Sequence, residues 1–283
     1  MTTAARAGTI RLGADLEVRR MGYGAMRLTD EGVWGPYPDH DHATAVLHKV
    51  IELGVDFIDT ANSYGPETNE ELIHEALSPY PEGLVIATKG GLTRSGPNRW
   101  ERNGDPAHLR EQCELSIRRL GVEAIDLYQL HAPDPEIPYA ESVGAMAELQ
   151  REGLVRHVGI SNVDSVQLEV ALDIVDVVSV QNRFSISDRD SLEVLLACER
   201  HELAFLPWFP LVAGDLEAGE VIDAIAERHD ATRFQIALAW LLQRSPVMLP
   251  IPGTSSLEHL EENVAAAAIR LTEEEMRDLE AVA

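Results

Sequence analysis

The stretch Leu84-Val85-Ile86-Ala87-Thr88-Lys89-Gly90, taken with the residues that follow it, decides the fold class of this chain. It is apolar almost throughout, which is typical of a strand buried on both faces of a parallel sheet. A helical pattern follows over residues 106–120, where Asp105 offers an N-cap and Pro106 a favoured first helical residue. A second apolar run over residues 124–131 completes a strand, a helix and a strand, which is the repeating unit of α/β folds.

The same alternation continues along the whole chain. Strands are expected over residues 20–24, 57–61, 84–90, 124–131, 155–162, 177–184, 204–210 and 247–254. Helices are expected over residues 42–53, 67–77, 106–120, 139–152, 164–172, 189–201, 217–229 and 257–267. Eight strands alternating with eight helices predict an α/β fold of the (β/α)8 TIM-barrel type, in a single domain over residues 1–283.

Three further segments are expected to lie around this barrel. Residues 9–19 are polar and centred on the turn Gly13-Ala14-Asp15, which predicts an N-terminal β-hairpin across the barrel floor. Residues 232–244 and 272–282 predict extra helices towards the C-terminus. A six-stranded doubly wound sheet is the alternative, but no G-x-G-x-x-G motif follows the first expected strand.

Composition and net charge argue against several classes of binding partner. The net charge of −25 argues against a nucleic-acid surface or an anionic membrane, and no apolar run approaches the roughly 18 residues of a membrane helix. Residues 1–6 precede no apolar signal-peptide core, and Cys113 and Cys198 indicate neither a disulfide framework nor a metal site. We therefore expect a cytoplasmic protein that acts on a small molecule, without a metal or an obligate protein partner.

Ionisable side chains stand at consecutive expected strand ends, where functional groups gather in a TIM barrel. Asp59 lies in the second expected strand and Tyr64 follows it, while Lys89 lies at the end of the third strand and His131 at the end of the fourth. Each residue alone has a structural interpretation, such as a loop cap for Asp59 or a packing residue for Tyr64. Their coincidence at one end of the barrel predicts a catalytic site.

The chemistry of these four residues is consistent with carbonyl reduction. A tyrosine has an ordinary pKa of about 10, and a neighbouring ammonium such as Lys89 favours the phenolate and lowers that pKa. Asp59 would keep a buried Lys89 charged, and His131 could orient a carbonyl or share the proton transfer. No residue is activated as a nucleophile. We therefore expect Tyr64 to protonate an alkoxide as it forms by hydride addition.

Three motifs carry a resemblance to a known family. They are Phe57-Ile58-Asp59-Thr60-Ala61 with Tyr64-Gly65 and Asn69-Glu70, the segment 116–133, and Ile251-Pro252-Gly253-Thr254-Ser255-Ser256 with His259 and Glu262-Asn263. With these motifs the chain resembles the aldo-keto reductases, and segments 22–36 and 239–246 resemble their bacterial pyridoxal reductase branch. The resemblance implies that Tyr64 is the general acid, that Asp59 and Lys89 tune it, and that His131 helps to bind the carbonyl.

The resemblance also implies a cofactor cleft. Ser161, Asn162 and Gln181 would hold the nicotinamide carboxamide, and Trp208 would stack on its ring. The whole set expected to bind the cofactor is Gly24, Ala25, Met26, Asp59, Ser161, Asn162, Gln181, Trp208, Phe209, Pro210, Leu211, Ile251, Gly253, Thr254, Ser255, Ser256, His259, Glu262 and Asn263. The substrate is expected to contact Trp34, Tyr64, Trp100 and His131, with the two tryptophans on loops that overhang the barrel mouth.

Cofactor and substrate choice follow from the same resemblance. NADPH is the expected cofactor. Gly253 and His259 stand where many relatives have Lys or Arg against the 2′-phosphate, and uncharged groups bind phosphate more weakly, so NADH is an alternative. Pyridoxal or another small aromatic or heteroaromatic aldehyde is the candidate substrate.

Two other functions remain open at this point. A non-catalytic, cofactor-sensing regulatory subunit on the same barrel is disfavoured by the four catalytic-type residues. A metal-dependent hydrolase using Asp59 and His131 is disfavoured because the sequence lacks clustered histidine ligands.

Overall fold

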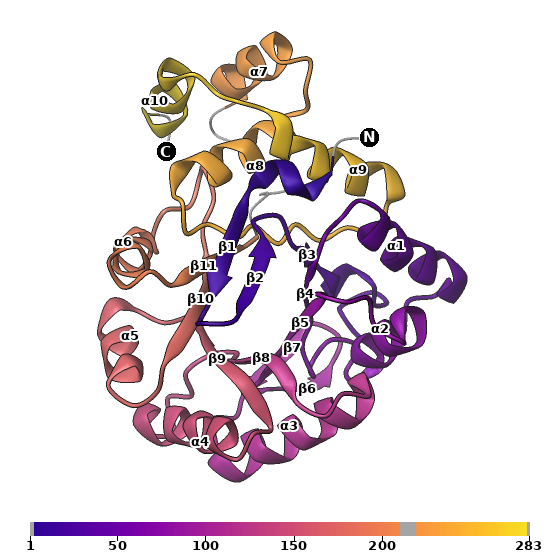
Figure 1. Cartoon of the computed structure of the whole chain (residues 1–283), viewed down its shortest axis with the longest axis vertical. Coiled ribbons are helices and arrows are strands. Elements are labelled where there is room, and N and C mark those ends of the chain that lie inside the picture. The colour runs from indigo at the N-terminus through magenta and orange to yellow at the C-terminus, as the bar shows by residue number, and fades with distance from the viewer. Residues whose placement is uncertain (1–2, 210–218, 282–283) are drawn as a thin grey trace.

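A computed structural model describes residues 3–209 and 219–281 of the chain. Helices surround a ring of strands, as expected for the barrel (Figure 1). The strands are β1 (Thr9–Leu12), β2 (Leu16–Arg19), β3 (Tyr23–Gly24), β4 (Phe57–Asp59), β5 (Val85–Gly90), β6 (Leu92–Gly96), β7 (Arg99–Arg102), β8 (Ile125–Leu130), β9 (Val155–Ser161), β10 (Val177–Arg183) and β11 (Ala204–Trp208). The helices are α1 (His40–Glu52), α2 (Thr68–Leu77), α3 (Pro106–Leu120), α4 (Tyr139–Arg151), α5 (Ser165–Leu172), α6 (Leu192–His201), α7 (Gly219–Arg228), α8 (Arg233–Arg244), α9 (Leu257–Ala265) and α10 (Glu273–Ala281).

Local sequence signals account for several helix starts. Asp105 accepts hydrogen bonds from the backbone of Ala107 and His108 at the start of α3, with Pro106 as its first residue. Ser256 accepts from the backbone of His259 at the start of α9. Both caps and the extra helices α8 and α10 confirm the sequence predictions. The expected helix over 189–201 begins later, at Leu192, and the start of the one expected over 217–229 lies outside the described residues.

Seven parallel strands form the barrel wall in the order β11-β10-β9-β8-β5-β4-β3. The prediction of a regular eighth strand over residues 247–254 is wrong, because only Met248 forms a bridge, to Phe205 of β11. Pro250 and Pro252 interrupt the ladder since they have no N–H to donate. The segment still closes the barrel, because the carbonyls of Pro250 and Pro252 accept from the backbone of Gly22 and Gly24, the latter in β3.

The hairpin β1–β2 closes one end of the barrel, as the sequence predicted (Figure 1). Its side chains Leu12, Leu16 and Val18 are buried in a core with Phe57 and Val85 from the first residues of β4 and β5. These contacts lie at the N-terminal ends of the barrel strands. The opposite end is therefore left for a functional site.

A second hairpin, β6–β7, was not expected from the sequence. It pairs Leu92 with Arg102 and Arg94 with Trp100, directly after β5. Trp100 thus lies on a strand and not on the loop we predicted for it. The Gly96-Pro97-Asn98 sequence between the two strands is the local turn signal that could have identified this hairpin.

Candidate active site

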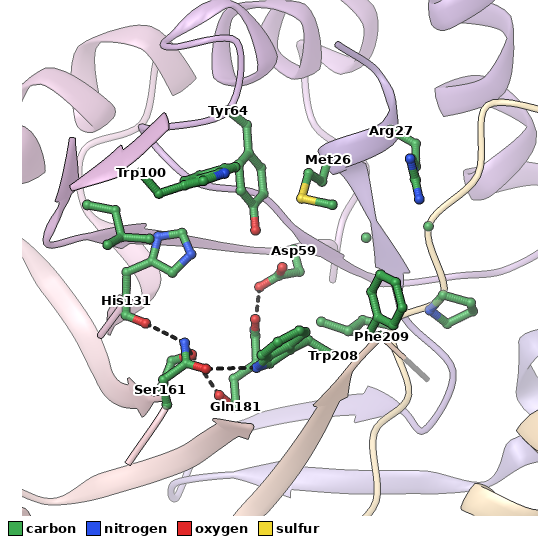
Figure 2. Close-up of a pocket in the computed structure, with 16 residues that line it drawn as sticks. Met26, Arg27, Asp59, Tyr64, Trp100, His131, Ser161, Gln181, Trp208 and Phe209 are labelled. Atoms are coloured by element: carbon green, nitrogen blue, oxygen red, sulfur yellow. Dashed lines mark hydrogen bonds between the residues drawn. The ribbon is translucent and has the colours of Figure 1, made fainter. Parts of the chain in front are cut away.

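A cavity of about 430 Å³ opens at the C-terminal ends of the barrel strands (Figure 2). The expected site residues that line it are Gly24, Met26, Asp59, Tyr64, Trp100, His131, Ser161, Asn162, Gln181, Trp208, Phe209, Ile251 and Gly253. The fold thus brings together residues from widely separated segments of the chain. Lys89 lies behind this wall, with no solvent-exposed surface.

Lys89 joins the acidic and phenolic groups at the floor of the cavity. Its Nζ donates to Asp59 Oδ2 at 2.6 Å, to the Thr60 carbonyl at 2.9 Å and to the Tyr64 hydroxyl at 3.3 Å. The other carboxylate oxygen of Asp59 accepts from Gln129 and Gln181. A buried ammonium and a buried carboxylate are therefore both paired and hydrogen-bonded, as burial of charge requires.

The loop that carries Tyr64, between β4 and α2, is fixed from behind by Asn69. Asn69 accepts a hydrogen bond from Thr60 and donates to the carbonyls of Ala25 and Leu28. These contacts tie the loop to the segment after β3. They give a physical reason for a buried asparagine at this position.

Burial and charge act in opposite directions on the pKa values of this cluster. Burial raises the pKa of Tyr64, and the positive charge of Lys89 offsets only part of that rise, so the pKa stays above its ordinary value. The lowered Tyr64 pKa that the sequence led us to expect is not found. Burial alone would lower the pKa of Lys89, but the charge of Asp59 and hydrogen bonds to Asp59 and Tyr64 raise it. At neutral pH the phenol is thus protonated and the lysine charged.

His131 follows β8 and faces Tyr64 across the cavity, with 5.9 Å between the ring centroids. Burial, with a smaller contribution from Lys89, holds its pKa well below the ordinary value, so the imidazole is neutral at pH 7. A neutral imidazole carries one N–H and can donate one hydrogen bond.

Polar side chains at the ends of β9, β10 and β11 form a connected group beside the cluster. Asn162 Nδ2 donates to the His131 carbonyl at 2.9 Å, and Asn162 Oδ1 accepts from the Trp208 indole at 3.0 Å. Ser161 donates to the Gln181 carbonyl at 2.6 Å. Gln181 uses Nε2 to reach Asp59, which leaves its Oε1 as an acceptor. Figure 2 shows Ser161, Gln181 and Trp208 along one side of the cavity.

Comparison with known proteins identifies the family. The family model described as "Aldo/keto reductase family" matches residues 20–283. This chain belongs to the aldo/keto reductase family. It is 50% identical over 272 residues to an uncharacterized oxidoreductase of Schizosaccharomyces pombe, with 96% of this chain and 88% of the relative covered. It is 39% identical over 281 residues to pyridoxine 4-dehydrogenase of Escherichia coli, with 97% of this chain and 98% of the relative covered. A Klebsiella pneumoniae aldo-keto reductase, solved in complex with NADPH, superposes with a TM-score of 0.81 at 28% identity, with 99% of this chain and 95% of that one covered.

As an aldo-keto reductase this chain is an oxidoreductase with a TIM-barrel fold, and the resemblance stated from its sequence motifs is confirmed. Residues 3–209 and 219–281 contain no cluster of three His, Cys, Asp or Glu side chains that could hold a metal ion. None of the helices in these ranges is long and apolar enough to cross a membrane.

The third motif of the reductase begins at the cavity, which Ile251 and Gly253 line, and continues beyond it to the start of α9. Thr254 accepts from the backbone of Ser256 and, through its carbonyl, from the Tyr23 hydroxyl at 2.6 Å. His42 contacts the Ser255 carbonyl at 2.7 Å. These contacts hold the loop in place beside the first N–H groups of α9.

Some expected site residues of the reductase do not line the cavity. Ala25 is buried, and Trp34 is 36% exposed and forms a bridge with Gly65. His259 is exposed on α9, Glu262 is half-buried and Asn263 is buried. Pro210 and Leu211 lie outside the described residues.

Several residues of the site were missed by sequence reasoning. Leu92, Pro252 and Arg27 line the cavity, and Gln129 contacts Asp59. Arg27 is exposed, and a Cβ added to Gly253 would lie 3.7 Å from Arg27 Cγ. The structure thus places a cation next to the position where the sequence showed none. Arg27 directly follows the expected site residues Gly24, Ala25 and Met26, so these neighbours were the available signal.

Proposed function

We propose that this aldo-keto reductase converts an aldehyde or ketone to the alcohol, with the proton supplied by Tyr64. The observation that carries the proposal is the contact of the Tyr64 hydroxyl with Lys89, which is itself paired with Asp59, at the floor of the cavity. The raised pKa of Tyr64 keeps the phenol protonated, as a general acid must be. That the chain is an oxidoreductase follows from its membership of the aldo/keto reductase family.

The proton transfer requires little movement of this cluster. A bound nicotinamide supplies a hydride to the carbonyl carbon, and the negative charge develops on the carbonyl oxygen. Tyr64 gives its proton to that oxygen, and Lys89 stabilises the resulting phenolate at 3.3 Å. Asp59 keeps Lys89 charged, because its carboxylate lies 2.6 Å from Nζ.

His131 is proposed to hold the carbonyl oxygen. Its imidazole is neutral, so it donates a hydrogen bond without competing with Tyr64 as a proton source. Nδ1 has no partner among the described residues, so the side chain is not already committed to a structural hydrogen bond through that atom. The carbonyl would then lie between the Tyr64 hydroxyl and the histidine ring.

The polar group around Gln181 fits a nicotinamide carboxamide. Gln181 Oε1 offers an acceptor for the carboxamide NH2. The donors of Ser161 and Asn162 beside it bond the Gln181 carbonyl, the His131 carbonyl and Ser161 Oγ, so one of these bonds would be exchanged for a bond to the carboxamide oxygen. Gly24 and Gly253 approach closely here, because a Cβ on Gly253 would lie 2.6 Å from the Gly24 carbonyl. A side chain on Gly253 would therefore collide with the backbone of Gly24.

NADPH is the proposed cofactor, with NADH as the alternative. The Klebsiella pneumoniae relative solved with NADPH supports the phosphorylated form. Arg27 beside Gly253 provides a charge that a dinucleotide phosphate can use. The preference for the 2′-phosphate would then depend on the Thr254–Ser256 hydroxyls and the α9 N-terminus.

Pyridoxal is the proposed candidate substrate, supported by the 39% identity to pyridoxine 4-dehydrogenase. The cavity has aromatic rings at Trp100, Trp208 and Phe209, against which a flat heteroaromatic aldehyde can pack. A purely aliphatic aldehyde lacks that contact.

The test is oxidation of NADPH and NADH in the presence of a panel of aldehydes that includes pyridoxal, benzaldehyde and a short aliphatic aldehyde. We expect turnover with NADPH and a higher kcat/KM for the aromatic aldehydes. Absence of turnover with every carbonyl and both cofactors, while the cofactors still bind, would refute catalytic function. Equal kcat/KM across the panel would refute the substrate assignment alone.

A further inference from the structure

Arg94 of β6 joins three segments around the catalytic loop. All five of its N–H donors meet neutral backbone carbonyls. These acceptors are Arg99 at 3.0 Å from Nε, Val33 at 2.8 Å and Ser63 at 3.0 Å from Nη1, and Gly32 at 2.7 Å and Gly96 at 3.4 Å from Nη2. Two acceptors lie in the β6–β7 hairpin, two in the loop after β3, and one immediately before Tyr64. A single guanidinium therefore fixes the hairpin and this loop to Ser63, the residue immediately before the acid Tyr64.

The same guanidinium holds Trp100 against the site. The Arg94 Cζ lies 3.7 Å from the Trp100 ring centroid, within the range of a cation–π contact. Trp100 meets Tyr64 edge-on at 6.3 Å and His131 at 6.5 Å between ring centroids, as Figure 2 shows for the three rings. An indole that is 38% exposed is thereby kept in one place on the cavity wall.

The charge of Arg94 is not neutralised within the part of the chain that the structure describes, since its five partners there are carbonyls and no carboxylate pairs with it. The charged groups that face Tyr64 are Lys89 of β5, Asp59 of β4 and Arg94 of β6, with the neutral His131 after β8. Burial and Asp59 raise the pKa of Tyr64, whereas Lys89 and Arg94 lower it. Arg94 thus acts on the phenol in the same direction as Lys89.

We propose that Arg94 is a positioning residue of the carbonyl reduction, which fixes the Trp100 wall over Tyr64 and gives the acid a second positive charge. This inference rests on the proposed function of Tyr64 as general acid. It also narrows the substrate class, because a rigid indole wall favours flat aromatic carbonyls over flexible ones.

Three variants separate the contributions of Arg94. Arg94→Lys keeps the charge but has three donors for five carbonyls, and Arg94→Gln loses the charge as well. Trp100→Leu removes the wall and leaves the charge and the carbonyl contacts of Arg94. The variants are compared by the pH dependence of alcohol oxidation, by KM for an aromatic and an aliphatic aldehyde, and by hydrogen exchange of residues 92–102.

Alcohol oxidation requires the phenolate, so its rate rises with pH through the pKa of Tyr64. In Arg94→Gln we expect this rise to move about 0.5–1 pH unit to higher pH, because one nearby positive charge is lost. In Arg94→Lys the rise should stay at the wild-type pH, and in Trp100→Leu, where the phenol loses some burial, it should not move to higher pH. All three variants should raise KM for the aromatic aldehyde on the order of tenfold, with little change for the aliphatic one.

Several outcomes would overturn the proposal. They are an unmoved pH profile in Arg94→Gln, an equal shift in Arg94→Lys or Trp100→Leu, and unchanged exchange of the hairpin in both Arg94 variants. If Arg94→Gln does not fold, Arg94→Lys and Trp100→Leu still test the proposal, since a profile shifted to higher pH in either variant contradicts the charge assignment. Hydrogen exchange needs no turnover, so an inactive wild type would refute the proposed function while the positioning contacts of Arg94 remain measurable.

Discussion

Replacement of Lys89 by methionine should destabilise the fold as well as the chemistry. Lys89 is fully buried and its only charged partner among the described residues is Asp59, which is 3% exposed. Removing one partner of a buried pair leaves the other charge uncompensated, at a cost of about 3–5 kcal/mol. At roughly 2–4 °C per kcal/mol for a domain of this size, the melting temperature should fall by about 6–20 °C.

Urea unfolding followed by circular dichroism measures this cost, and a double-mutant cycle with Asp59→Asn isolates the pair. The amide introduced by Asp59→Asn is neutral and could still accept from Gln129 and Gln181, so the double variant should be no less stable than Lys89→Met alone. Lys49→Met is the matched control, because Lys49 is the other lysine of the chain and pairs with half-exposed glutamates. Its free energy of unfolding should be almost unchanged. Additive losses from Lys89→Met and Asp59→Asn, or a Lys89→Met variant as stable as the control, would contradict a coupled buried pair.

Three further predictions concern the cofactor and pH. Arg27→Met should weaken binding of NADPH and NADH alike by roughly 10- to 100-fold in fluorescence titrations, because Arg27 lines the cavity shared by both; a loss confined to NADPH would refute that placement. His259→Arg should tighten NADPH about tenfold and leave NADH unchanged, and an unaltered preference would mean that His259 is far from the 2′-phosphate. The pKa of His131 lies well below 6.5 in the folded state, so its contribution to stability is complete above pH 6.5 and is lost as the pH falls towards the folded pKa. His131→Gln should therefore flatten the loss of unfolding free energy below pH 6.5, and an unchanged slope would exclude His131 as its source.

Much of the site was predictable because strand ends in a parallel barrel converge. The apolar run of β5 places Lys89 at its end, and the runs of β4 and β8 place Asp59 and His131, whatever the details of packing. Segment 247–254 was harder to predict. Its apolar pattern is strand-like, but Pro250 and Pro252 remove the donors that a ladder needs, so one bridge and a few accepting carbonyls close the barrel.

The contacts of Arg94 and Arg27 could not be read from the sequence. Arg94 meets carbonyls up to 62 residues away, and none of those acceptors has a side chain that would identify it as a partner. Arg27 approaches Gly253 only because β3 and the closing segment lie side by side. The direction in which the pKa of Tyr64 shifts from its ordinary value depends on how completely the phenol is buried, and a sequence motif does not specify that burial. Local patterns thus place the four central residues, whereas their environment depends on long-range packing.

The central claim is that Tyr64 supplies the proton. Replacement of Tyr64 by phenylalanine removes one hydroxyl and leaves the Lys89–Asp59 pair and the cavity wall in place. We expect aldehyde reduction by Tyr64→Phe to fall on the order of 10²- to 10⁴-fold in kcat, with the dissociation constant for NADPH unchanged. Retention of wild-type kcat by this variant would contradict the account.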